Sequence, residues 1–315
     1  MKIAFVVGEF PVVSETFIIN QIADLEERGI KVETFYFKRG KLKNISRRYF
    51  EKRMDAKASS LEMPNNFFKR FFLAISKFFH IFFFRPSLIL KIFNFKKYGR
   101  NAFSLKLLFW TEPFLGKEFD LVHCHFGPIA NKFLIIKEIL GLNVKMVTTF
   151  YGYDVSHIFA VKPVDYYDRL KKECSLFFVM SNNMKERIVA RGFDESRVEV
   201  LPVSIDVVSY PYQERNKGAD EPLKIISVGR FTEKKGFDDL LRALAILKKR
   251  GNDFECHLVG GGELEDELKK MTHDLGIEGE VKYEGYMPVE EVINYFLKMH
   301  LFVQPSKTAK DGDME

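Results

Sequence analysis

The chain has 315 residues and a net charge of +6, from 49 basic and 43 acidic side chains. Its length suits two domains of roughly 150 residues each, with room for a sizeable core. Because 29% of the residues are charged and 46% are apolar, the composition excludes both a multispanning membrane protein and a disordered chain.

The N-terminal segment reads as the start of an α/β domain. Residues 2–8 form a short apolar run that ends at a glycine, which is typical of a buried parallel strand. The run has neither the apolar core nor the cleavage site of a signal peptide, so we expect a cytosolic protein. A helical spacing of apolar residues follows, with Ser14 or Thr16 as the candidate N-cap, and residues 31–37 give a second strand. Right-handed crossover makes the two strands parallel.

The next segment interrupts this pattern with positive charge and phenylalanine. Residues 38–100 hold 17 basic but only three acidic side chains, and residues 67–95 carry 11 of the 33 phenylalanines. The stretch is too short and too charged to span a bilayer, so we predict a helical insertion at about residues 65–100. Its phenylalanines either pack against the domain or lie in a membrane interface, and nucleic acid is the least favoured partner. The basic residues interleaved with them include Lys69, Arg70, Lys77, Arg85 and Lys91.

The α/β alternation then resumes and continues to the end. In the first half we expect strands at 120–126, 144–150, 174–181 and 198–201, and helices at 129–140 and 183–191. Residues 209–222 are polar, contain two prolines and lack an apolar period, which predicts a linker. In the second half we expect strands at 223–228, 254–259, 280–283 and 300–303, and helices at 237–250, 263–275 and 289–297. Two doubly wound domains, 1–208 and 223–315, would bind ligands between them, at the carboxyl ends of their strands.

Two strings in the second half predict a phosphate site. In residues 227–237, a strand ends, the chain turns at Gly229, and Arg230 and Lys235 precede a helix. Two cations beside a helix N-terminus suit a diphosphate, although either cation alone would be an ordinary solvated loop residue. The second string runs a strand into Gly260, Gly261 and Gly262. Their backbone amides can approach a phosphate closely, but such a run is common in α/β turns.

The histidines and cysteines do not form a recognisable metal site. His123, His125 and His157 have no cysteine or carboxylate spacing beside them to complete one, so we interpret them as strand-end or loop residues. Of the three, His125 is the one expected to face the cleft, because it ends a strand. The three cysteines stand far apart, which argues against a disulfide framework and favours a reducing compartment.

Taken together, these strings resemble the family-4 retaining glycosyltransferases with the GT-B fold, in particular bacterial polysaccharide transferases of the colanic-acid type. In the second half the resemblance lies in Arg230-x4-Lys235-Gly236, Gly260–Glu263, Tyr283–Gly285 with Pro288, and Gln304–Ser306. In the first half it lies in Phe10-Pro11, Ser14–Phe17, His123–Gly127 and Phe150–Asp154. The resemblance covers nearly the whole chain.

This resemblance implies transfer of a hexose-type sugar from a nucleotide diphosphate sugar to a glycan or lipid-linked acceptor. The anomeric configuration would be retained, and the product would belong to a cell-surface polysaccharide. Arg230 and Lys235 would bind the donor diphosphate without a metal or other cofactor, beside Gly229 and the glycines at 260–262. Acceptor-side candidates in the cleft are Gly8, Glu9, Ser14, Glu15, His125 and Asp154. The other expected partner is an anionic membrane surface, on the inner face of the cell membrane, rather than nucleic acid.

The chain departs from the family's pattern at two places. Tyr151 stands where the family has a histidine that contacts the donor sugar, and a phenol is nearly never cationic at neutral pH. Glu315 matches the first glutamate of the family's Glu-x7-Glu motif, where it would contact the donor sugar, but the second glutamate is absent. We therefore expect a truncated chain with an incomplete second domain. For the function, the alternatives to a transferase are a GT-B sugar-nucleotide epimerase and an inactive or truncated sugar-nucleotide-binding protein.

Overall fold

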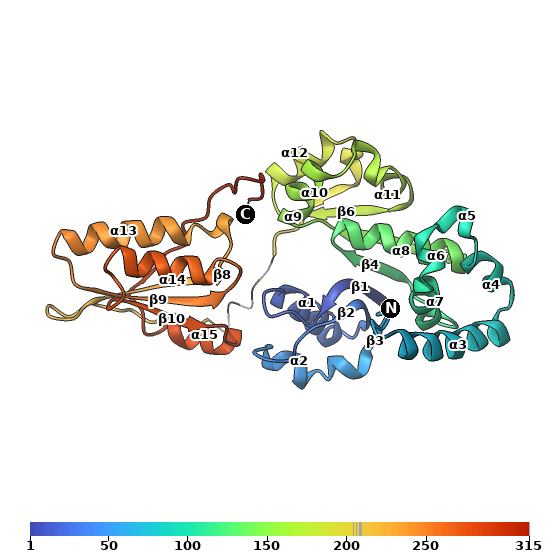
Figure 1. Ribbon diagram of the computed structural model, residues 1–315, viewed down its shortest axis with the longest axis horizontal. Coiled ribbons are helices and arrows are strands. Elements are labelled where there is room, and N and C mark those ends of the chain that lie inside the picture. Colours follow the sequence, from blue (N-terminus) through green and yellow to red (C-terminus); the bar gives the residue numbers. More distant parts are fainter. Residues whose placement is uncertain (204, 206, 208–209, 315) are drawn as a thin grey trace.

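The chain folds into two parallel β-sheets, each covered by helices, that lie next to one another (Figure 1). The structure is a computed structural model that describes residues 1–203, 205, 207 and 210–314. One sheet is built from the first 200 residues and the other from residues 223–302. The doubly wound α/β architecture expected from the sequence is confirmed.

The first sheet has seven parallel strands in the order β3-β2-β1-β4-β5-β6-β7. They are β1 (Lys2–Phe10), β2 (Lys31–Arg39), β3 (Ala58–Ser60), β4 (Leu121–His125), β5 (Lys145–Thr149), β6 (Leu176–Val179) and β7 (Val198–Val200). The short edge strand β3 was not predicted, because three residues of alanine and serine carry no apolar signal.

Helices cover both faces of this sheet. They are α1 (Thr16–Glu27), α2 (Arg47–Glu51), α3 (Phe67–Phe84), α4 (Ser87–Ile92), α5 (Phe95–Tyr98), α6 (Arg100–Phe103), α7 (Lys106–Thr111), α8 (Gly127–Leu140), α9 (Gly152–Val155), α10 (His157–Val161), α11 (Asp168–Glu173) and α12 (Asn182–Val189). Strand β1 shows why two cores form: Ala4 and Val6 pack with α8, while Phe5 and Val7 pack with α1. Alternate side chains of a strand point to opposite faces, so a fully apolar strand needs a helix on each side.

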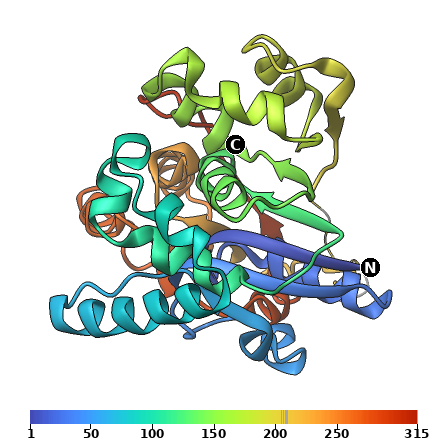
Figure 2. The ribbon, with the colours of Figure 1, turned by 90° about the vertical axis from the view of Figure 1, so that its right-hand side faces the viewer.

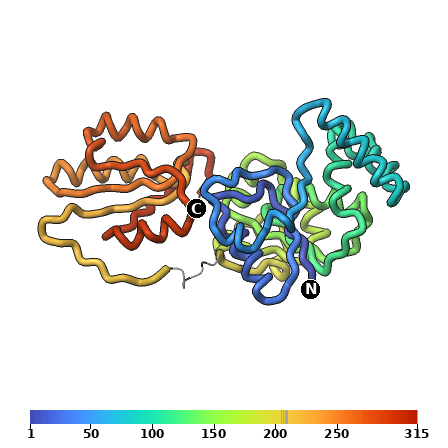
Figure 3. Tube along the Cα trace, turned by 90° about the horizontal axis from the view of Figure 1, so that it is seen from below, coloured from blue at the N-terminus to red at the C-terminus, as the bar shows by residue number. Residues whose placement is uncertain are grey.

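The predicted insertion is helical and stands out from the sheet. Helices α3 to α6 lie at the end of the first half that is remote from the second sheet (Figures 1 and 3). Viewed from that end, α3 runs along the outside of the molecule (Figure 2). No helix in the described part of the chain has the length and apolarity needed to cross a membrane.

The second sheet has four parallel strands in the order β10-β9-β8-β11. They are β8 (Leu223–Arg230), β9 (Phe254–Gly261), β10 (Val281–Gly285) and β11 (Leu301–Phe302), and the helices are α13 (Phe237–Lys249), α14 (Glu265–Asp274) and α15 (Val289–Phe296). Ile225 packs with α13 and α14 on one face, and Ile226 packs with α15 on the other.

Residues 210–222 connect the two sheets without a helix or strand, and residues 211–220 are exposed. Position 209 of the expected linker and position 208, where the first domain was expected to end, lie outside the described residues. The domain limits therefore stay a prediction.

Two local predictions are wrong. Helix α1 begins at Thr16, its N-cap position is Glu15, and no side chain caps it, because Ser14 lies before the cap and Thr16 lies within the first turn. The chain also does not turn at Gly229. Strand β8 runs on through Arg230, because these two residues still pair with Gly260 and Gly261 of β9.

Candidate functional site

The strand order identifies the place in each sheet where a ligand would bind. In the first sheet β1 lies between β2 and β4, and in the second β8 lies between β9 and β11, so the winding direction changes there. Doubly wound sheets bind ligands at such switch points, at the carboxyl ends of the strands. Gly8 and Glu9 lie near that end of β1, and His125 ends β4. Arg230 ends β8.

A cavity of about 630 Å³ lies where these strand ends face one another, and we call it the central cavity. Its lining comes from α1, α9 and α12 of the first half and from the end of β8 and the following turn. Six of the predicted site residues line it, namely Ser14, Glu15, Tyr151, Gly229, Arg230 and Lys235. Residues that lie up to 221 positions apart in the sequence are thus brought to one cavity.

A second cavity of about 260 Å³ shares Ser14, Gly229 and Arg230 with the central cavity. Its other walls are mostly apolar and come from β8, β9 and α15. Of the three consecutive glycines, Gly260 lines this cavity, and the carbonyl of Gly261 accepts a hydrogen bond from the Tyr286 hydroxyl at 2.6 Å. We call this the side cavity.

The glycines of the second half allow close backbone contacts. A Cβ atom on Gly260, whose φ is +135°, would lie 1.9 Å from the carbonyl oxygen of Gly229. A Cβ on Gly236, whose φ is +67°, would lie 1.9 Å from the carbonyl oxygen of Pro305. Only glycine fits at these two positions, because Gly260 lies against the backbone of β8 and Gly236 lies against the backbone at Pro305. Backbone packing alone therefore explains these glycines, and they are not by themselves evidence of a phosphate site.

The turn after β8 carries two lysines into the central cavity. Lys235 lines it with its methylene groups against Gly229, and an ion pair of 3.1 Å joins the buried Lys234 to Asp313. Arg230 is exposed at the mouth of the cavity. Three basic side chains thus lie in one wall, and Asp313 balances the charge of Lys234. Arg230 and Lys235 suit an anionic ligand such as a diphosphate.

Tyr151 forms part of the opposite wall. Its hydroxyl is hydrogen-bonded to His125 Nδ1 at 2.9 Å, and its ring packs on Phe17 and Phe126 with centroids 4.7 and 4.6 Å away. Burial raises the pKa of the phenol, and Glu15 and Asp154 raise it further. The side chain is therefore a neutral hydrogen-bonding group with a fixed position.

Asp154 lies beneath this wall rather than in it. Its carboxylate is fully buried and accepts hydrogen bonds from the backbone N–H of Tyr151 at 2.8 Å and of Gly127 at 3.1 Å. Burial raises its pKa to about 7, against the lowering effect of these two bonds. Asp154 thereby joins the loop after β5 to the start of α8, and it positions Tyr151 without lining the central cavity.

One of the three histidines is placed differently from the prediction. His125 is fully buried behind Tyr151 instead of facing the cleft, and its Nε2 has no hydrogen-bond partner among the described residues. Burial lowers the pKa of His123 to about 4 and holds that of His125 well below its usual value, so both are neutral. His157 is 3.2 Å from Asp311. Within the described residues, no group of three or more metal-ligating side chains is placed to hold an ion.

Three acceptor-side candidates on β1 and α1 differ in their surroundings. Glu9 is paired with Lys38 at 2.6 Å, and a Cβ on Gly8 would touch Ile129, so neither residue lines the two cavities. Glu15 is half-buried in the central cavity. Burial raises the pKa of its carboxyl to about 7, although Arg230 lowers it, and Glu9 raises it slightly.

Glu315 lies outside the described residues, but the tail before it crosses to the first half. Ser156 Oγ donates a hydrogen bond to Asp313 Oδ1 at 2.6 Å, and Met314 lines the central cavity. On the other side of the cleft, Ser46 Oγ and the Arg47 N–H donate to Glu290 Oε1 at 2.7 and 2.8 Å. The two halves are therefore tied on both sides of the cleft.

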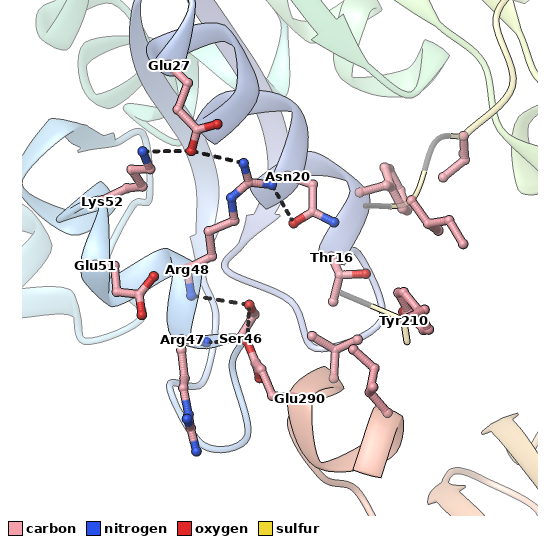
Figure 4. Close-up of a pocket in the computed structure, with 15 residues that line it drawn as sticks. Thr16, Asn20, Glu27, Ser46, Arg47, Arg48, Glu51, Lys52, Tyr210 and Glu290 are labelled. Carbon is pink, nitrogen blue, oxygen red and sulfur yellow. Dashed lines mark hydrogen bonds and ion pairs between the residues drawn. The ribbon is translucent and has the colours of Figure 1, made fainter. Parts of the chain in front are cut away.

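Those bonds to Glu290 border a larger cavity of about 740 Å³ between α1, α2 and α15 (Figure 4). Its charges are largely satisfied by one another: Arg48 binds Asp24 and Glu27 at 2.5 and 3.1 Å, and Lys52 binds Glu27 at 2.8 Å. It also lies away from the ends of β4 and β8. The central cavity is therefore the better candidate site.

Sequence reasoning missed several residues of the central cavity. Lys234 was passed over for its neighbour Lys235, although both line it. Phe17 belongs to the helically spaced apolar residues after Ser14, but it is only half-buried and packs on Tyr151. Phe126 has a φ of +73°, which is unusual for a bulky residue and turns the chain into α8. The one sequence signal for this turn is Gly127, which follows Phe126 directly after an apolar strand.

Comparison with known proteins gives concordant matches over both halves. Residues 14–208 match the family model described as Glycosyltransferase Family 4, and residues 211–312 match that of Glycosyl transferases group 1. The amylovoran biosynthesis glycosyltransferase AmsK of Erwinia amylovora is 34% identical over 326 residues, covering 100% of this chain and 78% of that relative. The putative colanic acid biosynthesis glycosyltransferase WcaL of Escherichia coli is 27% identical, with coverages of 100% and 78%.

A solved structure supports the fold. The crystal structure of Anabaena Alr3699/HepE in complex with UDP and glucose has a TM-score of 0.62 to this chain at 15% sequence identity. The match covers 99% of this chain and 76% of that one. At this identity the likeness concerns the fold alone, and it confirms the predicted GT-B arrangement.

Proposed function

The chain belongs to glycosyltransferase family 4, and on that premise we propose that it transfers a hexose-type sugar from a nucleotide diphosphate sugar to a growing cell-surface glycan. Membership of the family, and relatives in amylovoran and colanic acid biosynthesis, make it a glycosyltransferase of polysaccharide biosynthesis. The donor class, the acceptor and the stereochemistry are our proposal.

One observation carries the proposal: Arg230 and Lys235 line the same cavity as Tyr151 and Glu15. In the proposed complex Arg230 and Lys235 bind the donor diphosphate, and the side cavity receives the nucleoside. The sugar then lies toward Tyr151, and the acceptor enters from the side of α1. The cations stabilise the negative charge that develops on the leaving diphosphate, so this chemistry needs no metal.

We propose that the reaction retains the anomeric configuration through front-side attack. The bond between the anomeric carbon and the diphosphate oxygen breaks as the acceptor hydroxyl oxygen bonds to the same face of that carbon. The hydroxyl proton passes to the leaving diphosphate. Glu15 is the one carboxylate in the described lining of the central cavity. In this proposal it positions the acceptor and forms no covalent intermediate. A lipid-linked acceptor at the inner face of the cell membrane would place the enzyme there.

Acceptor-dependent release of nucleoside diphosphate tests this function. The purified protein is incubated with nucleotide sugars, with and without lipid-linked glycan acceptors, and the released diphosphate and the glycan product are measured. We expect release of nucleoside diphosphate only when donor and acceptor are both present. The new glycosidic bond should have the same anomeric configuration as the sugar in the donor. An epimerase would convert the donor without an acceptor, and an inactive protein would bind the donor without turnover. Either result would contradict the proposal.

Tyr151 is expected to affect donor choice. Replacing it by histidine restores the group found in the family and should keep the fold while raising activity or changing the preferred donor. Tyr151→Phe removes the hydroxyl that bonds His125 Nδ1 and leaves a buried nitrogen unpaired, which costs about 1–3 kcal/mol of stability. Thermal unfolding and a panel of nucleotide sugars measure both effects. If both variants match the parent with every donor, Tyr151 does not touch the sugar.

Glu15 is expected to make donor binding depend on pH. Its carboxyl, with a pKa of about 7, is mostly neutral at pH 6 and ionised at pH 8, where it competes with the diphosphate for Arg230. A repulsion of about 1 kcal/mol would weaken binding about fivefold over this range. Calorimetric titration with UDP and with GDP at both pH values measures the change. Glu15→Gln should remove the part of the pH dependence that comes from Glu15. The part that comes from ionisation of the nucleotide is the same for both proteins, so the difference between them isolates the effect of Glu15. The same pH dependence in the variant and the parent would be the contrary result.

A further inference from the structure

Helix α3 presents its apolar side chains to solvent. Only Ala74 and Ile81 of its 18 residues are buried. The exposed fractions of four phenylalanines are 71% for Phe68, 68% for Phe72, 50% for Phe79 and 79% for Phe83. The expectation that this segment packs its phenylalanines against the domain is therefore contradicted for most of them.

These side chains form one continuous surface. Phe68, Phe72, Ile75, Phe79 and Phe83 follow one another at intervals of three or four residues, so they lie on one side of the helix along its whole length. We call these five residues the phenylalanine face. Ala74 and Ile81, which contact the protein, lie on the opposite side. The face therefore points directly away from the molecule.

The polar side chains of α3 hold the helix to the protein. Lys77 forms an ion pair with Glu112, and His80 Nδ1 lies 2.7 Å from the same carboxylate. After the helix ends, the Arg85 guanidinium donates to the Leu140 carbonyl at 2.9 Å. Polar groups inward and aromatic rings outward are the reverse of an ordinary surface helix, whose apolar stripe faces the core. Exposed apolar patches of this kind mark interaction sites.

The charge around the face identifies the partner. Residues 65–100 contain eight basic and no acidic side chains. Two of these basic residues, Lys77 and Arg85, are already bonded to the protein. Four others are exposed and make no ion pair within the described residues, namely Lys69, Lys91, Lys96 and Arg100. An apolar face bordered by unpaired cations complements an anionic lipid surface, where phenylalanine enters the interface and the cations meet the headgroups.

A second copy of the chain fits this face less well, because two such faces would bring their unpaired cations together.

The position of the insertion also suits a membrane. It stands out at the end of the first half that is remote from the second sheet, so a flat surface bound there leaves the central cavity accessible (Figures 1 and 3).

We propose that the phenylalanine face of α3 inserts into the interface of an anionic membrane, with the helix lying in the membrane plane. This gives the membrane location in the proposed function a defined surface. Binding to vesicles needs no nucleotide sugar and no acceptor, so the two proposals are tested separately. A protein that does not bind vesicles could still transfer sugar. A protein that shows no sugar transfer in solution could still bind vesicles.

Flotation of the full chain with vesicles tests the proposal. We expect it to float with phosphatidylcholine vesicles that contain 30% phosphatidylglycerol, to float less as salt rises, and not to float with phosphatidylcholine alone. The double variant Phe72→Ser/Phe79→Ser should lower the bound fraction about tenfold or more, since the rings provide the salt-insensitive part. Lys69→Glu/Lys96→Glu should lower binding to anionic vesicles by a similar factor.

Matched controls come from the second half. Ile246 on α13 is 52% exposed, so Ile246→Ser removes an exposed apolar side chain elsewhere. Lys249→Glu/Lys270→Glu makes the same change in net charge at two exposed positions far from α3. Both controls should bind like the parent, and circular dichroism should show all variants folded.

Three results would overturn the proposal: equal binding to neutral and anionic vesicles, equal loss in the α3 variants and their controls, or no binding by the parent. Light scattering of the parent and of Phe72→Ser/Phe79→Ser adds a further outcome. If the parent is a dimer that this variant converts to a monomer while flotation is unchanged, the face joins two copies of the chain and the membrane proposal is wrong.

Discussion

Arg230→Ala should slow sugar transfer at least tenfold and weaken binding of the nucleoside diphosphate to a similar degree. Arg230 lies at the carboxyl end of β8, at the point where the second sheet changes its winding direction, and it lines both the central and the side cavity. Loss of a charge-assisted hydrogen bond to a partly buried phosphate costs about 1.5–3 kcal/mol, which is a factor of about ten or more in affinity. Lys235→Ala should act in the same direction.

The measurement is steady-state transfer together with calorimetric titration of UDP and GDP. Arg250→Ala serves as the control, since this exposed arginine follows α13 at the end remote from the cavity and should leave both quantities unchanged. Because Arg230 is exposed and in no core cluster, its removal should not change the unfolding temperature. If Arg230→Ala and Lys235→Ala both keep the kinetics of the parent, the donor site has been misplaced.

The fold was predictable because its signals are local. Apolar runs such as residues 2–8, followed by a glycine and a helical period, define parallel strands and their crossover helices without knowledge of the partner. Six of the seven strands of the first sheet and all four strands of the second follow from repeating that unit, and only the short edge strand β3 does not. The failed prediction at this level concerns a single position. The residue pattern offered Ser14 or Thr16 as the N-cap of α1, but the N-cap position is Glu15, which lies between them.

The direction in which side chains point was the harder question. The sequence predicted a helical insertion but left open whether its phenylalanines pack against the domain or point outward. Glu112, which anchors the polar side of α3, is distant in sequence. Likewise, a histidine at a strand end was predicted to face the cleft, and His125 is buried because Tyr151 from the next strand covers it. Both outcomes depend on contacts between segments, which periodicity does not encode.

The same dependence on distant contacts underlies the expected effect of Asp154→Ala, which should lower the free energy of unfolding by about 2–6 kcal/mol. The variant leaves the backbone N–H groups of Tyr151 and Gly127 unpaired in a fully buried place, and each costs about 1–3 kcal/mol. A typical domain has about 5–15 kcal/mol of stability, so the protein should still fold. Urea denaturation measures the loss, and Asp168→Ala, at an exposed carboxylate paired with Lys171, provides the control.

Asp154 should also affect transfer, although it does not line the central cavity. Its two hydrogen bonds hold the loop that carries Tyr151, so their loss should let the phenol move relative to Arg230 and lower the turnover number while changing nucleotide affinity little. Asp154→Asn sharpens the test. The amide can accept one bond through its oxygen but turns an N–H₂ donor toward the other N–H, so its stability and turnover should fall between those of the parent and the alanine variant. If Asp154 has a structural role only, its variants should be less stable but should keep the turnover number of the parent at temperatures where they are fully folded. That outcome would show that Asp154 does not act by positioning Tyr151.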